Sequence, residues 1–260
     1  RIAERPHLIW LRVQTDDAVR GLREPSFGPA RVETHIHDEI APRILGQDPM
    51  RIEALTRRAT GYVGDYGTGA EMRAVSALDI ALWDLAARAA DLPLARLLGG
   101  FVRDDIETYN TCAGPGYIKE AKGQSTENFA LGLGGPLDDL TAFMTDAGAL
   151  AQSLLDEGIT GMKIWPFDAA AEASGGRRIE TADLKAALRP FEQIRAAVGD
   201  RMRIMVELHG LWQLTPAIEI ARALAPFGTT WHEDPVAPHD IQALARYAAA
   251  SPAPVAASEK

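Results

Sequence analysis

The chain has very little cysteine and no long apolar run. Cys112 is the single cysteine, so no disulfide can form within the chain, as is compatible with a reducing cytosol. No apolar stretch approaches the roughly 20 residues that a membrane-spanning helix needs. The first residues, Arg1-Ile2-Ala3-Glu4, lack the apolar core of a secretory signal peptide. We therefore expect a cytoplasmic protein that does not enter a membrane.

Basic residues are also in deficit. The 260 residues include 27 Lys and Arg against 36 Asp and Glu, which gives a formal net charge of −9. A field of this sign repels phosphate, so we expect no nucleic-acid partner. The glycine-rich turn Gly-x-Gly-x-x-Gly, which binds dinucleotide phosphates, is missing after the first strand of the expected parallel sheet. This absence disfavours an open nucleotide-binding sheet.

The rest of the composition is that of an ordinary globular protein. Apolar residues make up 47% and charged residues 24% of the chain, which excludes a collagen-like or disordered protein. A chain of this length buries roughly 70–75% of its unfolded surface, so a full hydrophobic core is feasible. The length corresponds to one large domain or two smaller ones.

The first hundred residues mix strands and helices. The β-rich segment 7–13, the turn residues at 15–17 and the segment 18–22 predict a hairpin. Apolar periodicity predicts helices over 32–45, over 48–58 with Asp48 as the N-cap, and over 71–90. The segment 60–69 holds four glycines in ten residues, and we interpret it as a candidate lid.

After about residue 105 strands and helices alternate. We expect short strands at 106–112, 161–165, 203–208, 229–232 and 254–257, and helices at 137–155, 182–198, 216–224 and 241–249. This alternation predicts the α/β class, with a parallel sheet joined by right-handed crossovers. Five strands and four helices fit either an open doubly wound sheet or part of a barrel.

Three of the expected strands run into glutamate. Glu207, Glu233 and Glu259 are separated by 26 residues each time, which is one strand–helix unit. The constant step predicts equivalent positions on consecutive strands, and in a barrel these are the C-terminal mouths where active sites form. Three carboxylates there repel one another unless a hard divalent cation such as Mg²⁺ binds between them. The competing interpretation is that exposed glutamates fall at strand ends by chance.

Two further polar residues lie at strand ends. Lys163 lies in the second expected strand, and a partly desolvated lysine near a metal can act as a base. His209 lies two residues beyond Glu207 and so shares its face of the strand, where it can act as a general acid or base. Alternatively, Lys163 is a structurally paired lysine and His209 a hydrogen-bonded loop histidine.

A family signature lies in the strongest helix. Residues 74–88 read AVSALDIALWDLAAR, and Pro93-Leu94 and Leu97-Leu98-Gly99-Gly100 follow. This stretch resembles the first signature of the mandelate racemase and muconate lactonizing enzyme branch of the enolase superfamily. Glu207, Glu233 and Glu259 match the three Mg²⁺ ligands that this branch carries on barrel strands three, four and five. The resemblance extends over essentially the whole chain.

The resemblance implies a fold. Residues 1–105 would form an α+β capping domain with lid loops, in which the hairpin and the 60–69 loop close over the substrate. Residues 106–260 would form a partial TIM-like (βα)7β barrel, of which only about the first five strands are present, and would carry the metal site. Because a barrel needs about 250 residues by itself, we expect the sequence to be an incomplete account of a longer protein.

The resemblance also implies a first chemical step. A base removes the proton α to a substrate carboxylate, and Mg²⁺ stabilises the resulting enediolate. Racemases of the branch carry Lys-x-Lys on the second strand, whereas Lys163-Ile164-Trp165 keeps only the first lysine. Lys163 is therefore either the base or a group that neutralises the substrate carboxylate.

The third strand favours one reaction. Glu207-Leu208-His209 resembles sugar-acid dehydratases of the galactonate type, in which the histidine is the acid that expels the β-hydroxyl. We therefore predict a hydro-lyase that dehydrates an acid sugar to a 2-keto-3-deoxy acid, with Lys163 and His209 as catalytic residues. The usual second base of this family is a histidine on strand seven, which is oriented by an aspartate on strand six. These two strands have no counterpart in this sequence. We interpret Asp104, Asp105 and Asp168 as capping or loop residues.

Two other functions stay open at this point. One is a racemase, epimerase or cycloisomerase of the same superfamily, and the other is a non-catalytic homologue that keeps the fold. Whether the protein is a dehydratase or another enzyme of the superfamily, we expect its partner to be a small carboxylate substrate. Members of the family commonly form dimers or octamers, so we expect a homo-oligomer without a defined number of subunits.

Overall fold

The chain folds into two compact units. Among the described residues the first unit ends at Ile106 and the second begins at Glu107. The computed structural model describes residues 8–25, 28–61, 69–114, 116–117, 125–129, 132, 135 and 138–257. Most of the candidate lid at 60–69 therefore lies outside the described residues. Within the described part of the chain, no helix combines the length and apolar character needed to cross a bilayer.

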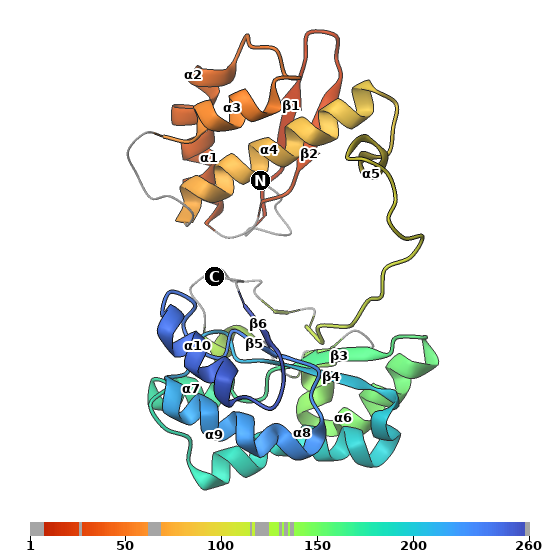
Figure 1. Ribbon diagram of the computed structural model, residues 1–260, viewed down its shortest axis with the longest axis vertical. Helices are drawn as coiled ribbons and strands as arrows, with labels where there is room; N and C mark the ends of the chain where they lie inside the picture. The colour runs from red at the N-terminus through yellow and green to blue at the C-terminus, as the bar shows by residue number, and fades with distance from the viewer. Residues whose placement is uncertain are drawn as a thin grey trace. The chain divides into compact units, whose positions relative to one another are not determined.

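The first unit is built around a hairpin and one long helix. Strands β1 (Leu11–Gln14) and β2 (Arg20–Arg23) pair antiparallel, which confirms the predicted hairpin. The helix expected over 71–90 is α4 (Gly69–Ala89), and it lies along the hairpin (Figure 1). Its buried face, including Leu78 and Leu82, forms the core of this unit.

Shorter helices complete the first unit. Helix α1 (Pro29–His35), a π-helical turn at Ile36–Ile40 and α2 (Ala41–Ile44) run on without interruption, and together they account for the helix expected over 32–45. Helix α5 (Leu94–Leu97) follows α4. The expected start of the next helix at Asp48 is wrong, because α3 is Ile52–Ala59. The Asp48 carboxylate instead accepts a hydrogen bond from the backbone N–H of Met50 (2.9 Å), which makes a turn before the helix.

Backbone contact between β2 and α4 requires a glycine. A Cβ on Gly21 would lie 1.9 Å from the carbonyl oxygen of Ala81 and 2.8 Å from the backbone nitrogen of Leu85. The next residue, Leu22, donates its N–H to the carboxylate of Asp84 on α4 (2.8 Å). The strand and the helix therefore touch through main-chain atoms, and a larger residue at position 21 must separate them.

Replacement of Gly21 by alanine should loosen this unit. We expect a loss of about 3 kcal/mol or more, because overpacking against backbone atoms cannot be relieved by a rotamer change. Amide hydrogen exchange would report it as faster exchange along α4, with the strands of the second unit unaffected. Arg23→Ala, at an exposed position of the same strand, is the matched control. Equal protection of α4 in both variants would contradict the account.

The second unit contains a parallel sheet with its strands in chain order. Strands β3 (Gly161–Ile164), β4 (Arg203–Glu207), β5 (His232–Glu233) and β6 (Val255–Ala256) pair consecutively. Figure 1 shows helices gathered along one face of this sheet. These helices are α6 (Asp139–Asp156), α7 (Asp168–Ser174), α8 (Thr181–Val198), α9 (Leu214–Leu224) and α10 (Ile241–Ala250). The predicted alternation is confirmed, and α7 is an additional helix that the periodicity did not indicate.

The expected strand at 106–112 is wrong in extent. It is reduced to one parallel bridge, in which Asn110 donates its N–H to the carbonyl of Gly161 and accepts from the N–H of Lys163 (2.9 and 2.8 Å). Ile106 is 77% exposed, and Cys112 adopts a left-handed backbone (φ 53°), which is not a strand conformation. The sheet therefore has a fifth position, which is occupied by a single residue.

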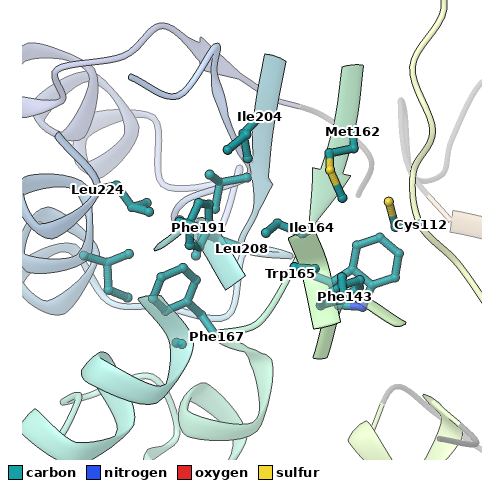
Figure 2. Packing of buried hydrophobic residues seen from close by; sticks show 14 of the residues in the cluster. Cys112, Phe143, Met162, Ile164, Trp165, Phe167, Phe191, Ile204, Leu208 and Leu224 are labelled. Atoms are coloured by element: carbon teal, nitrogen blue, oxygen red, sulfur yellow. The ribbon is translucent and has the colours of Figure 1, made fainter. Parts of the chain in front are cut away.

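The core of the second unit lies between the sheet and its helices. Figure 2 shows Phe143 beside Trp165, and Phe167 beside Phe191, with ring centroids 5.4 and 6.1 Å apart. Side chains alternate between the two faces of a strand. Because some residues of β3 and β4 point into this core, their neighbours Lys163, Met205 and Glu207 point to the opposite face. The opposite face of the sheet, at the ends of its strands, thus carries the polar groups.

A buried histidine ties β5 to α10. His232 is fully buried, with Nδ1 2.7 Å from the hydroxyl of Tyr247 and Nε2 2.8 Å from the hydroxyl of Thr229. Burial lowers the pKa of His232 to about 4, because the imidazolium would lose its hydration. The folded state therefore favours the neutral ring.

This burial predicts an acid-dependent loss of stability. The unfolded chain takes up a proton at His232 near pH 6.5, before the folded chain does, so the stabilisation is present above pH 6.5 and is lost as the pH falls towards 4. We expect a decrease in the free energy of unfolding on the order of 3 kcal/mol from this residue. Urea unfolding at several pH values gives the free energy of unfolding as a function of pH. This free energy should depend less steeply on pH in His232→Gln, and as steeply as in the wild type in His239→Gln, whose side chain is exposed. Equal slopes in all three proteins would contradict the assignment.

Candidate active site

The polar groups of the sheet gather at the carboxyl ends of three neighbouring strands. Glu207 is the last residue of β4 and Glu233 the last residue of β5, and the two are paired in register. Lys163 pairs with Met205, two residues before Glu207, so the alternation of side chains places all three groups on one face. The structure thus brings together three of the five residues that the sequence singled out.

The Lys163 ammonium lies between the two carboxylates. Its Nζ is 2.9 Å from Oε2 of Glu207 and 2.6 Å from Oε1 of Glu233. The side chains of Lys163, Glu207 and Glu233 are 10%, 1% and 18% exposed. Hydrogen bonds between ionised groups at such distances are the strong ones in proteins, and here little water competes with them.

The second oxygen of each carboxylate accepts hydrogen bonds from neighbouring N–H groups. Oε1 of Glu207 accepts from the backbone N–H groups of Leu208 and His209 (3.1 and 2.8 Å). Oε2 of Glu233 accepts from the indole N–H of Trp231 (3.1 Å). The carboxylates are therefore fixed by their own strands, and they present their remaining oxygens to one shared cation.

The pKa values follow from burial and this sharing. Burial lowers the pKa of Lys163, but its hydrogen bonds to Glu233 and Glu207 outweigh that effect and raise the pKa above its ordinary value. Burial raises the pKa of Glu207. Burial acts in the same direction on Glu233, but the hydrogen bonds that Glu233 accepts and the charge of Lys163 together outweigh it and lower the pKa of Glu233. Two carboxylates facing a single ammonium leave an excess of negative charge at the strand ends, which favours a further cation.

The third glutamate, Glu259, lies outside the described residues. The described part of the last strand, β6, pairs with β5, and Ala256 lies opposite Glu233. Glu207 and Glu233 pair in register, and the role of the third glutamate as a metal ligand stays a prediction. Within the described part of the chain, no three His, Cys, Asp or Glu side chains form a cluster that could hold a metal ion.

His209 lies beside this group and is paired with Asp168. Its Nδ1 is 2.7 Å from Oδ2 of Asp168, and both residues are buried, at 8% and 4% exposure. The edge-to-face contact with Trp165, at 5.9 Å between ring centroids, limits the ring from another side. Nothing in the apolar periodicity pointed to this pair, although both residues follow adjacent strands of the sheet.

Asp168 is more than the capping or loop residue that we expected. It begins α7, and its carboxylate also binds the His209 ring, on the loop that follows β4. The signal available in the sequence was its place, five residues beyond Lys163 at the end of the same strand. Asp104 and Asp105 are exposed residues of the segment after α5, as expected.

Removal of the shared cation should destabilise the second unit. Lys163→Met leaves two buried carboxylates without a counter-charge, and breaking a buried ion pair from one side costs about 3–5 kcal/mol. The double variant Lys163→Met/Glu233→Gln should recover part of this loss, because one of the two charges is then absent. Urea unfolding of the single and double variants measures these changes in stability. Lys185→Met, at an exposed position of α8, is the control. A Lys163→Met protein as stable as the control would show that the ion pairs contribute nothing.

Comparison with known proteins agrees with this geometry. Residues 3–99 match the family model described as mandelate racemase / muconate lactonizing enzyme, N-terminal domain, and residues 146–260 match the model described as enolase C-terminal domain-like. This chain belongs to the mandelate racemase and muconate lactonizing enzyme branch of the enolase superfamily. The sheet of its second unit is accordingly the first part of a TIM-like (βα)7β barrel, preceded by the α+β capping domain of the superfamily.

Several named members of the superfamily are similar to this chain. A D-galactonate dehydratase from Xanthomonas oryzae is 30% identical over 98% of this chain and 59% of its own length. An L-talarate/galactarate dehydratase from Salmonella typhimurium is 29% identical over 85% of this chain and 46% of its own length. The chain therefore spans about three fifths of the length of the D-galactonate dehydratase and less than half of that of the Salmonella enzyme.

Solved enolase structures share the fold closely. An enolase of the mandelate racemase subgroup from Agrobacterium tumefaciens is 48% identical with a TM-score of 0.85, and the match covers all of this chain and 63% of that one. An enolase from Sargasso Sea environmental sequencing is 41% identical with a TM-score of 0.84, over 99% of this chain and 62% of that one. The fold of both units therefore occurs within longer superfamily members.

Proposed function

We propose that this protein dehydrates a small acid sugar to a 2-keto-3-deoxy acid. The observation that carries the proposal is the convergence of Lys163, Glu207 and Glu233 at the ends of β3, β4 and β5, with His209 held beside them. The similarity to D-galactonate and L-talarate/galactarate dehydratases supports a hydro-lyase that acts on a carboxylate bearing a β-hydroxyl.

The residues at the strand ends fit a divalent cation. Glu207 and Glu233 already share one positive group at 2.9 and 2.6 Å, their donors are hard carboxylate oxygens, and one negative charge is in excess. Glu207, Glu233 and Glu259 would hold Mg²⁺, as is usual in this superfamily. When bound, the ion would stabilise the negative charge that develops on the substrate carboxylate.

The side chains of the chain itself have separate roles in this proposal. Lys163 binds anionic oxygens in the structure, so it would bind and neutralise the substrate carboxylate. A base then takes the α-proton, the bond between the β-carbon and its hydroxyl breaks, and His209 donates the proton with which the hydroxyl leaves as water. The resulting enol converts to the 2-keto acid, so all atoms of substrate are accounted for.

Two variants separate the steps of this reaction. A screen of acid sugars should give a 2-keto-3-deoxy product, and His209→Asn should reduce its formation by at least about 100-fold, because general acid catalysis contributes roughly 10²–10⁴-fold. Exchange of the substrate α-proton with deuterated water should persist in His209→Asn, whereas Glu233→Gln should abolish both exchange and product. Product analysis by mass spectrometry and exchange by proton NMR provide the measurements.

Other outcomes would favour the other functions. Inversion of the substrate at the α-carbon without a keto acid would identify a racemase or epimerase and contradict dehydration. No α-proton exchange with any acid sugar, in the presence of Mg²⁺, would identify a non-catalytic homologue.

A further inference from the structure

We infer that Asp168 is a positioning residue for the proton that His209 delivers. The carboxylate holds the ring by Nδ1, so that the proton delivered to the leaving hydroxyl is the one on Nε2. This inference rests on the proposed function, because it takes His209 as the acid. It adds a residue from the segment after β3, a different strand end from the one that carries His209.

The contact between the two side chains is short and shielded from water. Nδ1 of His209 and Oδ2 of Asp168 are 2.7 Å apart, in the range of a charge-assisted hydrogen bond. Burial of both residues below one tenth exposure keeps water from replacing either partner. Because a carboxylate accepts hydrogen bonds and does not donate them, Nδ1 carries the hydrogen in this pair. In the protonated ring, which carries a hydrogen on both nitrogens, the proton available for transfer is then the one on Nε2, and the ring is left neutral with its hydrogen on Nδ1.

The backbone of His209 is fixed as firmly as its ring. His209 adopts a left-handed conformation (φ 50°), which is unfavourable for a residue other than glycine. Its N–H is bound by the Glu207 carboxylate, and the following Gly210 donates its N–H to the carbonyl of Asp234 at 2.6 Å. Such a conformation persists where the surroundings determine it from several sides, as they do here.

The three constraints act on different parts of the same residue. Glu207 fixes its main chain, Asp168 fixes Nδ1, and the Trp165 ring lies edge-to-face against the imidazole. Asp168 is the one among them that determines which nitrogen carries which proton. Its loss should therefore leave the histidine in place but allow both tautomers and more than one ring orientation.

The test compares two reactions of one active site. In the full chain, Asp168→Ala should lower kcat for dehydration by on the order of 100-fold with little change in KM, since positioning cannot exceed the contribution of the acid itself. Exchange of the α-proton should stay near its wild-type rate, because that step does not use His209. Asp168→Glu should recover part of kcat, and Asp240→Asn, at the exposed start of α10, should change neither reaction.

A spectroscopic measurement reports the bond without turnover. Proton and nitrogen-15 NMR of the labelled histidines should show a downfield Nδ1–H proton signal for His209 in the wild type. In Asp168→Ala this signal should be lost, and the ring nitrogens should report a mixture of tautomers. The inference is overturned if Asp168→Ala keeps the wild-type signal and kcat, or if dehydration and exchange fall together, as a purely structural residue would cause. If His209→Asn still dehydrates, the proposed function fails first, so the two failures are distinguishable.

Discussion

The site depends on one interaction, the ammonium of Lys163 placed between the carboxylates of Glu207 and Glu233. Three ionised groups lie at the ends of β3, β4 and β5 with little access to water, where unpaired charges would be very unfavourable. The bonds at 2.9 and 2.6 Å make this arrangement possible. They also leave one carboxylate charge uncompensated, and a buried excess of negative charge is what a divalent cation can remove.

Parallel pairing is the reason that these residues meet. In register, neighbouring parallel strands point the same way, so Glu207 and Glu233 face the same side without any sequence proximity. The opposite side of the strands packs against the helices through a mostly apolar core, in which His232 is the polar residue that ties β5 to α10. Asp168 and His209 extend the same principle to the residues that follow β3 and β4, since adjacent strand ends bring their loops together.

The parts that sequence patterns predict best are those with a strong local signal. Helix α4 has a sustained apolar period, and β4 and β5 end in glutamate at a spacing of one strand–helix unit. The start of α3 was wrong because Asp48 satisfies a nearby backbone group in a turn, an alternative to capping with the same residue type. The strand at 106–112 was overestimated because β-propensity does not show whether a partner strand is available along its whole length.

Other features depend on tertiary contacts that no local pattern encodes. The role of Asp168 requires knowing which loops meet, and its contact with His209 joins residues 41 positions apart. The pairing of Ala256 in β6 with Glu233 depends on the stagger of the strands, which no local pattern encodes. The resemblance of the whole chain to the superfamily supplied what these patterns lacked, namely the barrel.

The most direct test of the account is an anomalous diffraction experiment with Mn²⁺ in place of Mg²⁺. The account predicts one strong anomalous peak within coordination distance of the carboxylate oxygens of Glu207 and Glu233, with Lys163 Nζ moved away from at least one of them. A map with no peak at this place, in which Lys163 keeps both of its bonds at saturating metal, would contradict the claim that these strand ends form a divalent-cation site.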